Sequence, residues 1–147
     1  MRVHINSRIP IAYGERILNN EKILGFIDKD GIFINKQNVE EKNLNKLTIQ
    51  VFWWKEKFKK ILSEIFFAIE NYELEVVKIT FSSDGFLTVE EKDLKTIFLG
   101  FRPNLINYQL QKINNLKDAF KKNRFSKKIH NIDLTNPDKP KIKVFKP

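Results

Sequence analysis

Asp28-Lys29-Asp30-Gly31 resembles the start of a calcium-binding loop, because carboxylates two residues apart can share one cation. An EF-hand loop needs Gly at its sixth position and Glu at its twelfth, where this chain has Phe33 and Val39. Asp and Gly are also the residues that a tight turn requires. We therefore interpret the segment as a turn and expect no metal site there.

Other residues that could support catalysis are few. The chain has no cysteine, which excludes disulfides, thiolate metal sites and cysteine nucleophiles. Its two histidines, His4 and His130, lie near opposite ends of the sequence. Asp133 precedes turn residues, so we interpret it as a backbone acceptor rather than a catalytic acid. We expect no enzyme activity, no catalytic residue and no cofactor.

The last segment is more informative because it alternates in character. In Lys141-Ile142-Lys143-Val144-Phe145, Ile142 and Val144 face one side of a strand while Lys141 and Lys143 face the other. A final strand reached through a Pro-rich turn tends to lie at a sheet edge, where a partner's strand can pair with it. Lysines on such an edge can also serve to prevent pairing. The pattern alone leaves both interpretations open.

The charge suggests anionic partners. Lys and Arg number 27 and Asp and Glu 18, which gives +9, and such a field attracts nucleic acid or acidic surfaces. The basic segment from Lys121 to Lys128 around Phe125 could grip nucleic acid, and the helix that begins near Phe52-Trp53-Trp54-Lys55 could lie on a membrane. A solvated helix end and a core-facing helix are the simpler interpretations, so nucleic-acid binding is kept only as an alternative.

The hydrophobic fraction of 41% excludes disorder over the whole length. A first strand, Arg2–Asn6, is expected to end at or before Pro10, because proline interrupts a ladder. Apolar residues at three- and four-residue steps predict one helix over Trp53–Glu70 and another from an N-cap at Asn104 to Lys121. Alternation and turn residues predict the other strands over 23–27, 32–34, 75–81, 86–89, 94–99, 129–134 and 141–145. This order predicts an α+β fold, a mostly antiparallel sheet with two amphipathic helices packed on one face.

Four segments resemble the FtsQ/DivIB family of bacterial cell-division proteins, in its cyanobacterial and plastid-like versions. Residues 3–12 resemble the end of the family's POTRA domain, with Ser7 at the usual Glu position. Residues 25–32 are similar to the hairpin that opens the family's β-domain, and Leu99-Gly100 to the Leu-Gly before its penultimate helix. Residues 132–140, Ile-Asp-Leu-Thr-Asn-Pro-Asp-Lys-Pro, resemble the family's closing stretch.

The resemblance implies a non-enzymatic scaffold of the septal division complex. It divides the chain into the last strand of a truncated POTRA-like domain at 1–13 and a β-domain at 14–147. In this family the β-domain binds small coiled-coil partners, FtsB/FtsL-like, through β-augmentation of its terminal strand. Carried over by position, the partner-binding residues are Asp133, Leu134, Thr135, Asn136, Lys141, Ile142, Lys143 and Val144. Thr135 replaces an Arg, and Asn136 replaces an aromatic residue found in some members.

The resemblance also implies a cellular location. Family members have a cytoplasmic tail, a transmembrane helix and a complete POTRA domain before the point where this sequence begins. With such an anchor the expected place is the extracytoplasmic side of the cell envelope. The composition is rich in Lys, Asn, Ile and Phe, as AT-rich genomes impose, so a shortened plastid-encoded remnant is the alternative.

Overall fold

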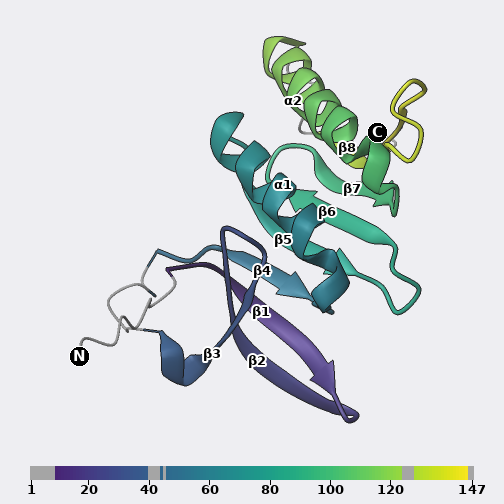
Figure 1. Ribbon diagram of the computed structural model, residues 1–147. Coiled ribbons are helices and arrows are strands. Elements are labelled where there is room, and N and C mark those ends of the chain that lie inside the picture. Colours follow the sequence, from purple (N-terminus) through teal and green to yellow (C-terminus); the bar gives the residue numbers. More distant parts are fainter. Residues whose placement is uncertain (1–8, 40–43, 45, 124–127, 146–147) are drawn as a thin grey trace.

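The computed structural model describes residues 9–39, 44, 46–123 and 128–145. Its described part confirms the α+β fold: two long helices and nine strands in a single sheet. Figure 1 labels both helices and strands β1–β8. The strands are β1 (Pro10–Leu18), β2 (Glu21–Asp28), β3 (Phe33–Asn35), β4 (Ile49–Phe52), β5 (Val76–Phe81), β6 (Leu87–Glu91), β7 (Lys95–Gly100), β8 (Ile129–Asp133) and β9 (Lys141–Val144). The helices are α1 (Lys59–Asn71) and α2 (Ile106–Asn123), with 3₁₀ turns η1 (Lys36–Asn38), η3 (Glu56–Phe58) and η4 (Pro103–Leu105).

The strands follow the order β3-β2-β1-β4-β5-β6-β7-β8-β9 across the sheet. Neighbours are antiparallel except for the parallel pairs β1·β4, β4·β5 and β7·β8. Two of these parallel pairs are joined by crossover helices, α1 between β4 and β5 and α2 between β7 and β8. The sheet is therefore a chain of hairpins linked by two βαβ units.

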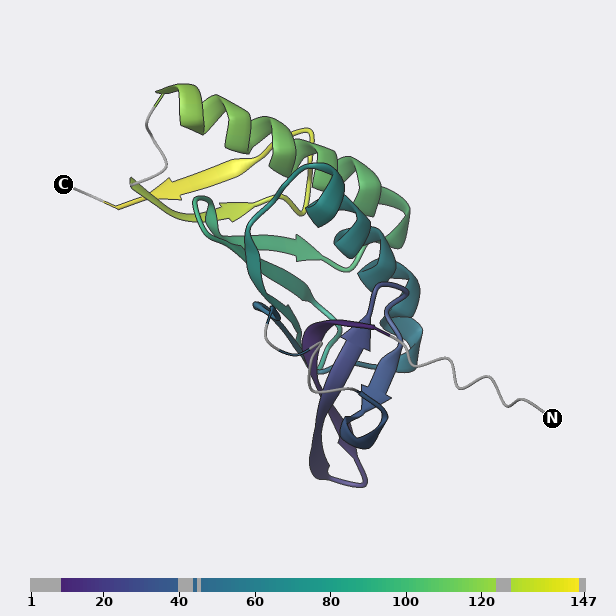
Figure 2. The same ribbon diagram turned by 90° about the vertical axis from the view of Figure 1, so that its left-hand side faces the viewer.

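Both helices lie on the same side of the sheet, as Figure 2 shows. Ile61, Leu62 and Ile65 of α1 and Ile106, Leu110 and Ile113 of α2 are all buried. They share one core with the inward side chains of the strands. No helix in the described part of the chain is long and apolar enough to cross a membrane.

Strands β5 to β9 confirm the sequence prediction. The predicted start of the first helix, at Trp53, was wrong. Ile49–Phe52 forms β4, which the sequence analysis did not predict, and α1 begins only at Lys59. Trp53 has a left-handed backbone, with φ of 62°, which ends the strand and cannot start a helix. Asn104 lies inside η4 rather than at a helix N-cap.

Proline does not end the first described strand. Pro10 is the first residue of β1, where a missing N–H costs little, and β1 runs on past Tyr13 without a break at the expected domain boundary. The strand predicted over Arg2–Asn6 lies outside the described residues. The β1–β2 hairpin closes through Asn19 and Asn20, both with positive φ, as in a type I′ turn.

A buried ion pair fixes α2 against the end of β6. Lys117 Nζ lies 2.6 Å from Glu91 Oε2, and both side chains are buried. Burial would raise the pKa of the Glu91 carboxyl. Hydrogen bonds from Lys117 and from the backbone N–H groups of Glu75, Asp93 and Leu94 outweigh burial and lower this pKa below its ordinary value. Glu91 is therefore a satisfied buried carboxylate in a structural role.

The turn between β2 and β3 holds the N-terminal half together. Asp28 accepts the backbone N–H groups of Asp30 and Ile32, so these acidic residues form a turn, as predicted. Gly31 has φ of 79°, and its carbonyl accepts the buried Trp54 indole N–H at 2.8 Å. A Cβ on Gly31 would collide with the carbonyl oxygen of Lys59, where α1 begins.

We expect Gly31→Ala to lower the free energy of unfolding by about 3 kcal/mol, since both the left-handed backbone and the collision are penalised. Gly85 is the matched control, because its φ is 86° but a Cβ there meets no atom within 4 Å. Gly85→Ala should cost only about 1 kcal/mol. Urea unfolding of both variants checks the difference, and equal losses would contradict the close packing of the turn on α1.

Candidate functional site: the sheet edge at β9

Strand β9 is the last strand of the sheet, at the C-terminal margin predicted from the sequence. It pairs antiparallel with β8 and, within the described residues, with no other strand. It is the bright yellow arrow in Figure 2, beside β8, with which it pairs. All four of its residues are exposed, so its outer side is accessible to another chain.

The apolar residues of β9 extend the core row of the sheet to its margin. Ile142 lies opposite Ile132, and Val144 lies opposite Ile129. Directly opposed residues share one face of a sheet, so both side chains lie on the helix-covered face. Ile132 and Ile129 are fully buried, whereas Ile142 is 41% and Val144 53% exposed. A partner strand would cover this apolar surface.

The backbone of β9 offers hydrogen bonds on its outer side. The N–H of Phe145 donates to the carbonyl of Lys128 at 2.8 Å, so it points inward from the edge. Backbone N–H groups alternate in direction along a strand, and Lys143 therefore points the same way as Phe145. The N–H and C=O groups of Ile142 and Val144 point outward, which is the arrangement that an added strand requires.

The opposite face of β9 is cationic. Lys141 lies opposite Asp133, and Lys143 lies opposite Asn131. Asp133 accepts the N–H of Thr135 at 2.9 Å. Hydrogen bonds from the side chain and the backbone of Thr135, together with the charge of Lys141, lower the pKa of Asp133 against the effect of burial. This confirms Asp133 as a backbone acceptor and leaves the lysines as the exposed charges of the edge.

The Leu134 side chain is not accessible to a partner, although the resemblance places this residue in the recognition region. Its side chain is fully buried. Its N–H donates to the carbonyl of Phe98 at 2.8 Å, and its carbonyl accepts Gln109 Nε2 at 2.9 Å. The same Nε2 group donates to the carbonyl of Leu99 at 2.8 Å. Leu134 and Gln109 therefore anchor the segment that leads to β9.

The following turn is exposed but held against α2. The carbonyl of Thr135 accepts Arg102 Nη1 at 2.9 Å. The Asn136 side chain accepts the N–H of Asp138 at 3.1 Å, and Tyr108 donates its hydroxyl to the Asp138 carboxylate at 2.6 Å. Thr135 and Asn136 are thus exposed residues of the turn that leads to β9.

Sequence reasoning missed the three residues that hold this turn: Arg102, Tyr108 and Gln109. Their partners lie 33, 30 and 25 residues away, and no local spacing signals such contacts. No group of three or more acidic or histidine side chains suited to a metal ion occurs in the part of the chain that the structure describes.

A comparison of the chain with models of known protein families found no match. A search of curated proteins found none either.

We expect Gln109→Ala to lower the free energy of unfolding by about 2–3 kcal/mol, because it removes two buried hydrogen bonds to carbonyl oxygens. Gln111→Ala is the control, since Gln111 is exposed on the same helix, and it should change stability by less than about 0.5 kcal/mol. Urea unfolding measures both. Similar values for the two variants would show that the Gln109 amide does not fix the end of the sheet.

Proposed function

We propose that the chain is an FtsQ/DivIB-type β-domain, a non-enzymatic scaffold of the septal cell-division complex. It binds small coiled-coil partners, FtsB/FtsL-like, when a segment of the partner adds to β9 as a further strand. The observation that carries the proposal is the open margin of β9, where outward N–H and C=O groups lie beside exposed Ile142 and Val144. Main-chain pairing supplies affinity in this mode and side chains supply specificity.

The positions of the segments that resemble the FtsQ/DivIB family support the proposal. Residues 25–32 occupy the end of β2 and its turn, Leu99-Gly100 ends β7 before α2, and residues 132–140 run from β8 to β9. Each segment therefore lies on the kind of element that the resemblance implies. The segment at 3–12 lies mostly outside the described residues.

The lysines of β9 favour one kind of partner over another. If two copies of β9 paired antiparallel, their Lys141 and Lys143 side chains would gather on one face, and like charges opposite each other are destabilising. A strand with carboxylates at those positions would gain instead. The lysines thus disfavour self-association and favour a partner strand in which acidic and apolar residues alternate. Under this proposal, the same lysines prevent pairing between copies and allow pairing with the partner.

The proposed function places the domain on the extracytoplasmic side of a membrane, attached through an anchor, with a plastid as the alternative location. Nucleic-acid binding is the alternative function and rests on the charge of +9. Its candidate segment, Lys121 to Lys128 around Phe125, lies partly outside the described residues. Binding to nucleic acid would weaken steeply with salt. The logarithm of the affinity would fall against the logarithm of the salt concentration with a slope of about −0.7 to −0.9 per neutralised phosphate.

We expect Ile142→Pro to weaken binding to the cognate coiled-coil partners by about tenfold or more, because proline removes one outward N–H and crowds an approaching strand. The inward bonds to β8 are made by neighbouring residues and stay intact. Isothermal titration against the partners' extracytoplasmic segments measures the effect.

Ile142→Val is the control, because it keeps both the N–H and a β-branched side chain, and we expect its affinity to stay within about threefold of the unsubstituted chain. If the Pro and Val variants bind equally well, strand addition at β9 is not how the partner is held.

A further inference from the structure

The β1–β2 hairpin extends beyond the rest of the sheet. β1 pairs with β2 along its length, but with β4 only over Ala12–Gly14. Beyond Glu15, whose carbonyl accepts the N–H of Trp54 at 2.9 Å, the two strands of the hairpin pair only with each other and form an arm, visible in Figure 1 at the end of the molecule away from α2. A groove of about 310 Å³ opens where the arm leaves β4.

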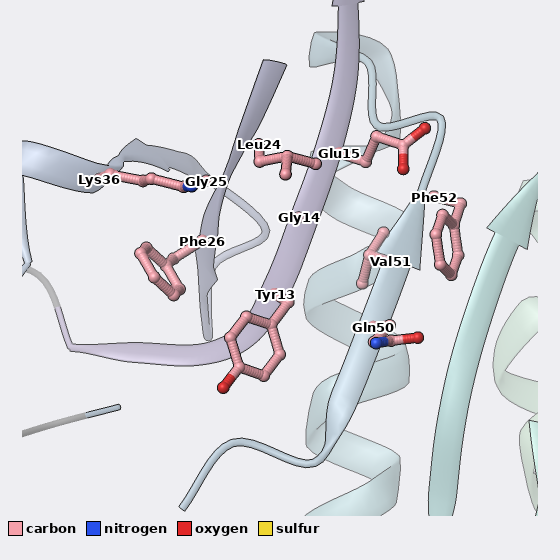
Figure 3. Close-up of a pocket in the computed structure, with 10 residues that line it drawn as sticks. All are labelled: Tyr13, Gly14, Glu15, Leu24, Gly25, Phe26, Lys36, Gln50, Val51 and Phe52. Carbon is pink, nitrogen blue, oxygen red and sulfur yellow. The ribbon is translucent and has the colours of Figure 1, made fainter. Parts of the chain in front are cut away.

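The groove has apolar walls and faces away from the helices. Tyr13 and Phe26 lie side by side with ring centroids 5.7 Å apart. Leu24 and Phe52 also line the groove, from β2 and β4 respectively, as Figure 3 shows. Leu24 is 51% and Tyr13 40% exposed. We call this site, lined by Tyr13, Leu24, Phe26 and Phe52, the Leu24 groove.

Two charged residues, Glu15 and Lys36, are among the described residues that line the Leu24 groove. Glu15 Oε1 lies 3.6 Å from Lys22 Nζ and forms an ion pair with it. Lys36 reaches the groove from η1. Lys78 Nζ lies 5.1 Å from the centre of the Phe52 ring, and Lys78 lies opposite Glu90 of β6. Among the described residues, no carboxylate forms an ion pair with Lys36 or Lys78. The whole chain carries +9, which disfavours a second copy as the occupant.

We propose that the Leu24 groove is a second docking site, which takes a large apolar side chain from an acidic segment of a partner protein. The apolar walls supply the pocket for an anchor residue, and Lys36 supplies complementary charge for a flanking carboxylate. The site lies at the opposite end of the sheet from β9 and does not depend on the function proposed for that edge. A scaffold with both sites could hold two partner segments at once.

Selection from a library of random peptides tests this site directly. The bait is the full chain carrying Ile142→Pro, which blocks strand addition at β9 and removes that edge from the selection. We expect enriched peptides that place Phe, Trp or Leu next to Asp or Glu. No enrichment, or enrichment without acidic residues, would overturn the proposal.

Titration of the best peptide then locates its site. Leu24→Ser should weaken binding about tenfold and Lys36→Glu about threefold, whereas Lys139→Glu, a control at the exposed turn before β9, should leave it unchanged. Amide shift changes in the unsubstituted chain should centre on Tyr13 and Leu24, a readout that does not depend on how the variants fold. Affinity that is insensitive to both groove substitutions, or shifts centred elsewhere, would contradict the assignment.

Discussion

The side-chain amide of Gln109 donates to the carbonyl oxygens of Leu99 and Leu134 at the same time, and the C-terminal end of the sheet depends on this pair of bonds. β7 and β8 are parallel, so the two carbonyls lie at the same end of their strands. Buried acceptors without donors are costly. One residue in the first turns of α2 thus joins the helix to both strands and fixes the direction in which the chain leaves towards β9.

The exposed margins follow from how the helices cover the sheet. α1 and α2 bury the central strands on one face, and their inward residues are fully enclosed. At β9 the apolar row continues past that cover, which leaves Ile142 and Val144 partly exposed. At the other end the β1–β2 arm leaves β4, and its apolar residues border an open groove. The β9 margin therefore lies where the sheet extends beyond the helices, and the Leu24 groove lies on the face of the sheet opposite the helices.

Periodic patterns in the sequence predicted the elements that are long or sharply bounded. The stripe of Ile61, Leu62 and Ile65 identified α1, and the turn residues between β5, β6 and β7 identified the meander. β4 was missed because it has only four residues and runs directly into Trp53, whose left-handed backbone no sequence pattern announces. Pro10 is the first residue of β1, and the strand predicted before it, Arg2–Asn6, lies outside the described residues.

Only part of the candidate site could likewise be predicted from the sequence. The Pro-rich turn and the alternation over residues 141–145 were enough to predict an edge strand, and β9 lies at the edge. The contacts of Arg102, Tyr108 and Gln109 with the segment that leads to β9 join residues 25 or more positions apart. Such contacts arise only when α2 has crossed over the sheet, so local spacing could not reveal them.

The central claim is that β9 bonds to its own sheet on one side and is open on the other. Hydrogen exchange at single-residue resolution, recorded by NMR on the free protein, tests this claim most directly. We expect slow exchange at the amides of Lys143 and Phe145 and fast exchange at those of Ile142 and Val144. Equal protection at all four amides would mean that the outer side of β9 is already occupied, and fast exchange at all four would mean that the strand is not paired with β8.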